Sequence, residues 1–219
     1  MSGKDIRIVI VDDHPLVRDG LKAGLSARPE WKVCAEAESV SEALAVVQTH
    51  SPDMAIIDLS LREGSGLDLV QHLTSAGRPL RILVCSMHDE ALYARRAIQA
   101  GAMGFLHKQR ASDCLVPAVE RILSGKLYVS ESIADSILMS LTKPRLTFSS
   151  PFEQLTNREL AIFELVGRGQ TMAQIAKSLH LSIKTIETYR ERAKRKLNLR
   201  TSAELLRCAV KWVGEHASE

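Results

Sequence analysis

Asp53-Met-Ala-Ile-Ile-Asp-Leu-Ser60 is the stretch that decides the fold of this chain. Its apolar residues lie between Pro52 and a loop that contains Gly64 and Gly66, and they stop at Asp58. A short strand that is apolar on both faces is typical of a parallel sheet covered by helices on each side. Asp58 is then at the carboxyl end of that strand, where open α/β sheets bind their ligands. Taken alone, an aspartate after a strand is more often a turn or capping residue.

The first half of the chain repeats one pattern, in which a short apolar run is followed by a helical stripe. The apolar runs cover residues 6–11, 33–37, 54–59, 82–85 and 104–106. Strands that alternate with helices of this length imply right-handed crossovers and a parallel sheet. We therefore expect residues 1–124 to form a five-stranded, doubly wound α/β domain.

The pattern changes after residue 124. Residues 125–150 have the composition of a linker, with one short helical candidate at 131–141. From residue 152 on, the apolar spacing is helical and predicts helices at about 157–166, 171–179, 183–197 and 202–213. We therefore expect residues 151–219 to form a second, all-α domain of four helices.

Composition narrows the class of protein. A chain with 45% hydrophobic and 25% charged residues is ordinary for a globular protein, which argues against extended disorder. The sequence has no apolar run of membrane-spanning length and no signal peptide before the first strand, so we expect a cytoplasmic protein without a membrane partner. The four cysteines lie far apart and lack Cys-x-x-Cys spacing, which favours buried thiols over a zinc site or disulfides.

Charge differs between the two halves. Residues 1–124 hold 14 Lys and Arg against 16 Asp and Glu, whereas residues 151–219 hold 12 against 8. Much of the basic excess lies in Arg192-Ala-Lys-Arg-Lys196. This asymmetry is consistent with a polyanionic partner for the second domain, although a solvated helix face explains the charge equally well.

Polar residues end four of the five predicted strands. Asp12 and Asp13 follow the first strand, Asp58 ends the third, Ser86 ends the fourth and Lys108 follows the fifth. Three carboxylates in one small pocket repel one another unless a cation intervenes, and hard oxygen ligands favour Mg²⁺. A carboxylate nucleophile beside a hydroxyl and an ammonium is suited to accepting a phosphoryl group.

This set of residues, with Gly66 eight positions after Asp58, resembles the receiver domain of bacterial two-component response regulators. Val11-Asp-Asp-His-Pro-Leu-Val-Arg18 is similar to the NarL/FixJ branch in particular. The resemblance implies a flavodoxin-like fold, with Asp58 as the phosphoacceptor and contacts from Ser86 and Lys108 to the phosphoryl group. It also implies that Phe105 is an aromatic switch, a position that plain core packing would satisfy as well.

The resemblance further implies a set of Mg²⁺ ligands. These are the carboxylates of Asp13 and Asp58 and the backbone carbonyl of Ser60, with Asp12 acting mainly through water. His14 and His107 flank the pocket, but without a second histidine or cysteine cluster we expect packing or surface roles for them.

Two positions near the pocket depart from the receiver pattern. Gln109 follows Lys108 where many receivers have proline, and we expect a trans bond because a cis bond to a non-proline residue costs roughly 2.5–4 kcal/mol. Arg62 stands where a proline is common, which places a cation near the predicted phosphate.

The second domain contains two helices joined by a short turn, at residues 172–179 and 183–197, which together describe a helix-turn-helix. Leu155-Thr-Asn-Arg-Glu159 has the signature of a capped helix start. The outward side chains of the second of the two helices are mixed polar, as groove contacts require. They are Lys184, Glu187, Thr188, Glu191 and Arg192.

These features resemble the LuxR-type helix-turn-helix domain over residues 152–213. The matching positions are Leu155-Thr-x-Arg-Glu159, Ile175-Ala176, Leu181-Ser182, Thr185-Ile186 and Lys196-Leu197, and Tyr189 departs from the usual histidine. The resemblance implies that Glu187, Thr188 and Glu191 read bases and that Lys184, Thr185, Arg192 and Lys196 contact phosphates. Carboxylates in the groove can accept from cytosine N4 but repel phosphates, so nonspecific affinity should be modest.

The last helix carries more apolar surface than a small domain needs. Its leucines could equally pack within the domain or form a dimer contact. For Trp212 we expect a dimer contact.

The leading hypothesis is a non-enzymatic transcription regulator that a sensor histidine kinase phosphorylates on Asp58 and that binds promoter DNA as a homodimer. A Mg²⁺-dependent phosphohydrolase is a second hypothesis, but Asp58-Leu-Ser60 lacks the second acid of an Asp-x-Asp motif. A third is a receiver-type DNA-binding protein that never uses phosphate, which Gln109 keeps open.

Overall fold

The structure is a computed structural model that describes residues 5–61, 63–77, 79–142 and 150–216. The chain divides into two compact units, Met1–Ala134 and Asp135–Glu219. In the ranges that the structure describes, no helix combines the length and the apolar character needed to cross a bilayer. All four cysteines are free thiols, and burial raises the pKa of the Cys85 thiol to about 12.

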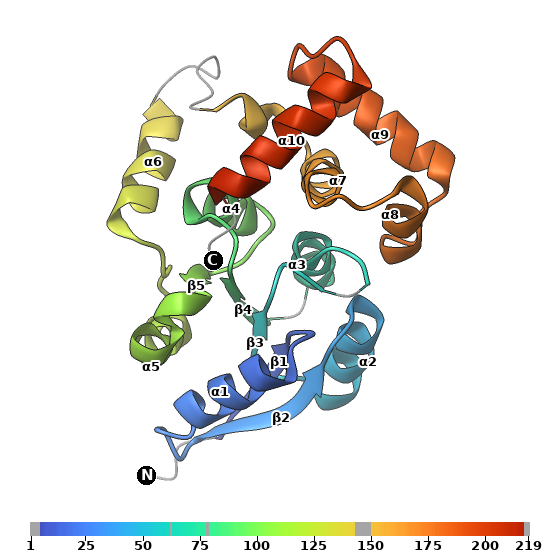
Figure 1. Cartoon of the computed structure of the whole chain (residues 1–219). Helices are drawn as coiled ribbons and strands as arrows, with labels where there is room; N and C mark the ends of the chain where they lie inside the picture. Colours follow the sequence, from blue (N-terminus) through green and yellow to red (C-terminus); the bar gives the residue numbers. More distant parts are fainter. Residues whose placement is uncertain (1–4, 62, 78, 143–149, 217–219) are drawn as a thin grey trace. The chain divides into compact units, whose positions relative to one another are not determined.

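The first unit is a five-stranded parallel sheet in the order β2-β1-β3-β4-β5. Its strands are β1 (Ile6–Val11), β2 (Trp31–Ala37), β3 (Met54–Ile57), β4 (Arg81–Ser86) and β5 (Gly104–His107). Its crossover helices are α1 (Pro15–Leu25), α2 (Val40–His50), α3 (Gly66–Ser75), α4 (Glu90–Gln99) and α5 (Ala111–Leu123). Figure 1 shows α1 and α5 on one face of the sheet and α2, α3 and α4 on the other, as the doubly wound prediction requires.

The sheet is buried on both faces. All four residues of β3 are at most 1% exposed, and the last four residues of β1 are fully buried. β2 begins at Trp31, two residues before the predicted run, because Trp31 is buried and pairs in register with Ile6. β3 ends at Ile57, so Asp58 is the first residue after the strand.

Side-chain caps fix where three of the five crossover helices begin. Ser39 accepts from the Glu42 N–H at the start of α2, Ser65 accepts from Asp68 at α3, and Asp89 accepts from Leu92 at α4. α3 also begins close to the backbone that follows β3, because a Cβ atom on Gly66 would lie 2.3 Å from the Asp58 carbonyl oxygen. The helix starts therefore surround the carboxyl edge of the sheet.

The chain that leaves the sheet is still tied to β5. The Phe105 N–H donates to the Tyr128 carbonyl at 2.9 Å, and the Tyr128 N–H donates to the Met103 carbonyl at 2.9 Å. The Ser130 N–H donates to the Glu90 carboxylate of α4 at 3.3 Å. The first residues of the predicted linker therefore belong to the first unit, and α6 (Glu131–Thr142) follows them.

Residues 143–149, which the sequence assigns to the same linker, lie outside the described residues.

The second unit is helical, as predicted. A short 3-10 turn, η2 (Pro151–Gln154), precedes α7 (Asn157–Gly167), α8 (Met172–Ser178), α9 (Ile183–Lys196) and α10 (Ser202–His216). Thr156 and Thr171 form complete capping boxes with Glu159 and Gln174, and Ser182 caps α9. α7 and α10 pack closely, because Gly167 leaves room for the Ala209 carbonyl, 2.4 Å from the place of a Cβ atom.

The expectation that Trp212 serves a dimer contact is wrong. Trp212 is 4% exposed, and its ring lies 5.8 Å from that of Phe152 and 5.9 Å from that of Phe163. A small helical unit has little apolar area to bury, so this aromatic cluster supplies its core. Leu205 and Ala209 are also buried, whereas Leu206 and Val210 are about half exposed.

Candidate functional site: an acidic pocket and a basic helix

The pocket lies where the carboxyl ends of β1 and β3 meet. These two strands are hydrogen-bonded neighbours, and the Asp58 N–H donates to the Val11 carbonyl at 2.8 Å. On the other side of β1, the Asp12 N–H donates to the Ala37 carbonyl of β2 at 3.0 Å. Asp12 and Asp58 are thus held by backbone hydrogen bonds, and both are at least 98% buried.

Both carboxylate oxygens of Asp58 have partners. The Ser86 hydroxyl at the end of β4 lies 2.6 Å from Asp58 Oδ1, and Lys108 Nζ lies 2.8 Å from Asp58 Oδ2. Lys108 Nζ also contacts Asp12 Oδ2 at 2.7 Å. The structure therefore brings together the residues that the sequence placed at separate strand ends.

Lys108 carries the positive charge of the pocket. Burial by itself lowers the pKa of this ammonium group, but the carboxylates of Asp58 and Asp12 outweigh burial and raise the pKa above its ordinary value. The ammonium group therefore stays charged at neutral pH and faces the predicted phosphoacceptor.

The third acidic side chain of the pocket, Asp13, is suited to binding a cation. Asp12, Asp13, His14 and Asp58 each offer a ligand atom, and these atoms lie within 4.8 Å of one another. Asp13 Oδ1 is buried without a hydrogen bond, although His14 Nδ1 lies 2.7 Å from it. A buried carboxylate oxygen without a hydrogen bond fits a hard divalent cation such as Mg²⁺. The ring of His14 is exposed and lies at the flank of the acidic cluster.

The other predicted positions fall as follows. Phe105 of β5 is 1% exposed, three residues before Lys108. Ser60 lies in the loop after Asp58, where its carbonyl remains a predicted ligand, and Arg62 lies outside the described residues. His107 lies at the end of β5, and its Nε2 contacts the Met87 carbonyl at 3.2 Å. The described residues contain no cis peptide bond, so Lys108–Gln109 is trans as predicted.

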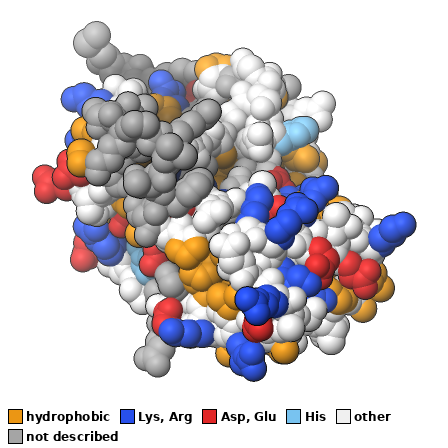
Figure 2. Space-filling model, turned by 90° about the horizontal axis from the view of Figure 1, so that it is seen from above, with side chains coloured by type: hydrophobic (Ala, Val, Ile, Leu, Met, Phe, Trp, Pro, Cys, Tyr) orange, Lys and Arg blue, Asp and Glu red, His pale blue; other side chains and the backbone are white. Residues whose placement is uncertain are grey.

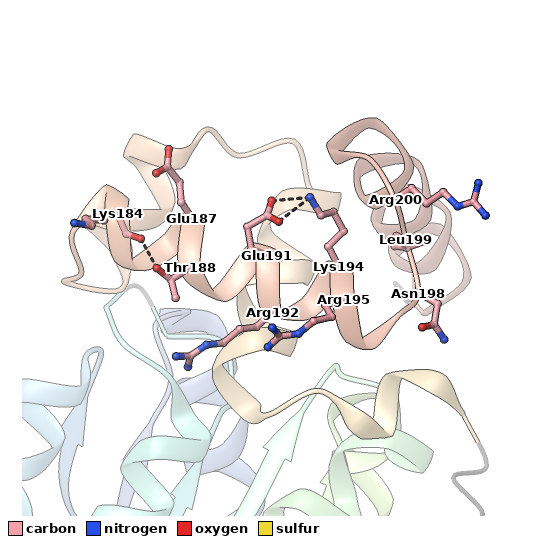
Figure 3. Close-up of a pocket in the computed structure, with 10 residues that line it drawn as sticks. All are labelled: Lys184, Glu187, Thr188, Glu191, Arg192, Lys194, Arg195, Asn198, Leu199 and Arg200. Atoms are coloured by element: carbon pink, nitrogen blue, oxygen red, sulfur yellow. Dashed lines mark hydrogen bonds and ion pairs between the residues drawn. The ribbon is translucent and has the colours of Figure 1, made fainter.

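In the second unit, α9 borders an open groove of about 930 Å³ (Figure 3). Of the residues predicted to contact DNA, Lys184, Glu187, Thr188, Glu191 and Arg192 line it, and Thr185 and Lys196 do not. The sequence did not predict its other lining residues, which are Lys194, Arg195, Asn198, Leu199 and Arg200.

α9 carries acidic and basic side chains close together. In Figure 3, Glu187 points away from Arg192 and Arg195, whereas Glu191 lies beside Lys194. The Glu191 carboxylate is paired with Lys194 Nζ at 2.7 Å. Figure 2, which views the molecule from the top of Figure 1, likewise shows Lys and Arg clusters with acidic side chains among them.

Lys196 has an internal partner that the sequence did not reveal. Its Nζ lies 2.6 Å from the Glu159 carboxylate, which also accepts from the Thr156 N–H at 2.8 Å. Glu159 is 2% exposed, so this ion pair ties the end of α9 to the start of α7. Lys196 therefore orients the helix, and its contact with a phosphate remains a prediction.

The Glu159–Lys196 pair predicts a pH-dependent stability. Burial raises the pKa of Glu159, but Lys196 and the Thr156 N–H outweigh it, so the pKa lies below its ordinary value. A carboxylate with a lowered folded-state pKa stabilises the fold above its unfolded pKa and loses that contribution as the pH falls through the folded pKa. We expect Glu159→Gln to lower the thermal midpoint of the helical unit at pH 7, with the difference shrinking below about pH 4.5.

Thermal unfolding by circular dichroism at several pH values measures this difference. Glu191→Gln, in an exposed pair, is the matched control and should change the midpoint little. An effect of Glu159→Gln that stays constant with pH would contradict the assignment.

Sequence reasoning missed one residue beside the pocket and two that hold the chain after β5. His88 Nδ1 lies 2.8 Å from the Ser86 hydroxyl, and Glu90 and Tyr128 hold the chain that leaves β5. The position of His88 two residues past a strand end was a usable signal. The hydrogen bond of Tyr128 uses its backbone and leaves no mark in the residue type.

Comparisons with known proteins assign each of the two units to a known domain family. Residues 8–120 match the response regulator receiver domain family, and residues 153–209 match the bacterial regulatory proteins of the luxR family. The response regulator UvrY of Escherichia coli strain K12 is 32% identical over 206 residues, 94% of each chain. The oxygen regulatory protein NreC of Staphylococcus epidermidis is 33% identical over 212 residues, which are 94% of this chain and 97% of that protein.

A solved structure shows the same fold. It is the structure of RcsB from Salmonella enterica serovar Typhimurium bound to a promoter in the presence of the phosphomimetic BeF3⁻. The match has a TM-score of 0.69 at 23% sequence identity, and it covers 94% of this chain and 99% of the RcsB chain. The receiver match alone spans more than half of the chain, and the curated relatives match across both units. The chain therefore belongs to the two-component response regulators of the NarL/FixJ family, with a receiver domain followed by a LuxR-type DNA-binding domain.

Proposed function

We propose that this response regulator accepts a phosphoryl group from a sensor histidine kinase on Asp58 and then binds promoter DNA as a homodimer. The observation that carries the proposal is the position of the Asp58 carboxylate, 2.8 Å from Lys108 Nζ and 2.6 Å from the Ser86 hydroxyl. The kinase, the dimer and a cytoplasmic location extend the family assignment to this chain.

The chemistry is transfer to a carboxylate oxygen. The bond between phosphorus and the phosphohistidine nitrogen of the kinase breaks while a bond forms between phosphorus and Asp58. The Lys108 ammonium and the Ser86 hydroxyl then act on the phosphoryl oxygens, where negative charge accumulates. Their positions are fixed by β5 and β4, so little reorganisation is needed.

The pocket also fits Mg²⁺. Asp13 and Asp58, with the Ser60 carbonyl, would hold the ion, and Asp12 would act mainly through water. The bound ion would neutralise charge on the phosphoryl oxygens. The buried Asp13 Oδ1 that lacks a hydrogen bond supports this assignment.

A route from the pocket to the linker is present within the first unit. The two residues of the predicted switch lie in this unit, with the Phe105 ring buried and the Ser86 hydroxyl 2.6 Å from Asp58 Oδ1. The Phe105 N–H donates to the Tyr128 carbonyl, so a shift of β5 moves the start of the linker. Phosphorylation would act by changing the populations of two such arrangements.

We assign the DNA contacts to α9. Glu187, Thr188 and Glu191 would face bases, and Lys184 and Arg192 would face phosphates, all from one groove. The exposed Glu191–Lys194 pair is of the weak, surface kind, so DNA can replace it at small cost. The half-exposed Leu206 and Val210 on α10 are available for a dimer contact.

Two substitutions on α9 separate the phosphate and base contacts. Arg192→Ala should weaken binding to all duplexes and reduce the slope of log affinity against log salt by about 1. Glu187→Gln should leave that slope nearly unchanged while relaxing base preference, because it removes a carboxylate and keeps the side-chain shape. Fluorescence anisotropy on a selected duplex and on a random duplex at several salt concentrations distinguishes these outcomes, and equal behaviour of the two variants would contradict the assignment.

The alternative hypothesis is a DNA-binding regulator that does not use phosphate, and one observation favours it: Gln109 follows Lys108. It predicts that DNA affinity ignores a phosphoryl analogue. The hydrolase reading predicts multiple turnover of a phosphate ester, for which Asp58-Leu-Ser60 provides no second acid.

The proposed function is tested by incubating the full chain with Mg²⁺ and acetyl phosphate and following its intact mass. We expect a gain of one phosphoryl group. No gain over the incubation would contradict phosphorylation of the receiver.

A further inference from the structure

We propose that His88 is a positioning residue that directs the proton of the Ser86 hydroxyl toward Asp58 and, after transfer, toward the phosphoryl group. This inference rests on the proposed phosphorylation of Asp58. The observation behind it is a three-member chain in which Ser86 Oγ lies 2.6 Å from Asp58 Oδ1 and 2.8 Å from His88 Nδ1.

The direction of these hydrogen bonds follows from counting protons. A serine hydroxyl has one proton to donate and lone pairs to accept with, whereas a carboxylate only accepts. The Asp58 carboxylate faces the Lys108 ammonium, so the hydroxyl proton of Ser86 goes to Asp58. His88 Nδ1 must then carry a hydrogen and donate it to Ser86 Oγ, which fixes the imidazole tautomer.

His88 is itself held in place from several sides. Its ring lies 4.3 Å, centre to centre, from the ring of the buried Tyr93, and Asp89 caps α4 directly after it. On its other side, the Met87 carbonyl contacts His107 Nε2 at the end of β5. The imidazole therefore packs on Tyr93, and the backbone on both sides of His88 is held by α4 and by the end of β5.

A fixed donor behind Ser86 has two consequences for phosphoryl transfer. It occupies one lone pair of Ser86 Oγ, so the hydroxyl rotor has one favoured direction, and it polarises the O–H bond that points into the pocket. A hydroxyl without that donor can rotate among several directions. Loss of one such hydrogen bond should slow phosphorylation about two- to tenfold.

The variants follow from the geometry of the imidazole. His88→Phe keeps an aromatic ring beside Tyr93 and removes the donor. His88→Asn keeps a donor at the right reach, because the asparagine Nδ2 and the histidine Nδ1 are both bonded to Cγ. Ser86→Ala removes the hydroxyl through which His88 is proposed to act.

The experiment measures the rate of phosphoryl uptake by the full chain from acetyl phosphate at saturating Mg²⁺, using intact mass against time. We expect His88→Phe to be about two- to tenfold slower than wild type and His88→Asn to stay within about twofold of it. In the Ser86→Ala background, His88→Phe should change the rate by no more than about twofold. Thermal midpoints of all variants confirm that the receiver is folded.

Three results would overturn the inference: an unchanged rate in His88→Phe, a rate in His88→Asn as slow as in His88→Phe, or the full His88→Phe effect in the Ser86→Ala background. The last would mean that the ring acts by filling space or gating access. If wild type itself gains no phosphoryl group, the proposed function fails and this inference fails with it. If wild type gains a phosphoryl group and His88→Phe gains it at the same rate, the role of His88 is overturned while the proposed function stands.

Discussion

Asp58→Asn is expected to abolish phosphoryl uptake from acetyl phosphate while leaving the receiver folded. The amide lacks the anionic oxygen that attacks phosphorus. Its carbonyl oxygen can still accept from Ser86 or Lys108, and Lys108 keeps its 2.7 Å contact with Asp12, so the pocket loses its chemistry without losing all its hydrogen bonds. The uptake of this variant should fall to background.

Intact mass and peptide mapping check this result. Asp19→Asn is the matched control, because Asp19 is an exposed aspartate on α1 that pairs with Lys22 on the surface. We expect the control to take up phosphate at the wild-type rate. Residual uptake by Asp58→Asn would place the phosphoacceptor at another residue and contradict the assignment of Asp58.

Gly66→Ala is expected to destabilise the receiver by about 2–4 kcal/mol. A Cβ atom at this position would lie 2.3 Å from the Asp58 carbonyl oxygen and 2.5 Å from Leu59 Cα, and both of these are backbone atoms with little freedom to move. Relief of the overlap must displace either α3 or the segment that carries Asp58. Because small misplacements of reacting groups slow reactions strongly, phosphoryl uptake should also fall at least about tenfold.

Gly20→Ala is the control for this substitution. Gly20 lies in α1 and has no atom within 4 Å of its would-be Cβ, so alanine should stabilise the helix by about 0.5–1 kcal/mol. Thermal and urea unfolding of both variants measure the contrast. Equal stability of the two variants would mean that the start of α3 can move away from the Asp58 backbone at no cost.

Much of the pocket follows from the sequence because it depends on strand ends. Parallel strands place their carboxyl ends at one edge, so Asp12, Asp58, Ser86 and Lys108 converge once the sheet is recognised. The hydrogen-bond partners of these side chains depend on loop geometry. His88 was not predicted for that reason, although it lies only two residues past Ser86.

The helical unit shows the same limit. Helical periodicity gives its four helices within a few residues, because apolar spacing and caps are local signals. Periodicity cannot say which apolar face meets which neighbour. Trp212 was assigned to a dimer contact for that reason, whereas it packs against Phe152 and Phe163, and Lys196 proved to have the buried partner Glu159.

We propose that occupancy of the Asp58 pocket controls DNA binding by α9. The direct test measures the affinity of the full chain for a duplex selected from a random library, with and without beryllium trifluoride and Mg²⁺, for wild type and Asp58→Asn. We predict a gain in wild-type affinity on the order of ten- to a hundredfold, and no gain in Asp58→Asn. Equal wild-type affinity in the two conditions, or the same gain in Asp58→Asn, would contradict it.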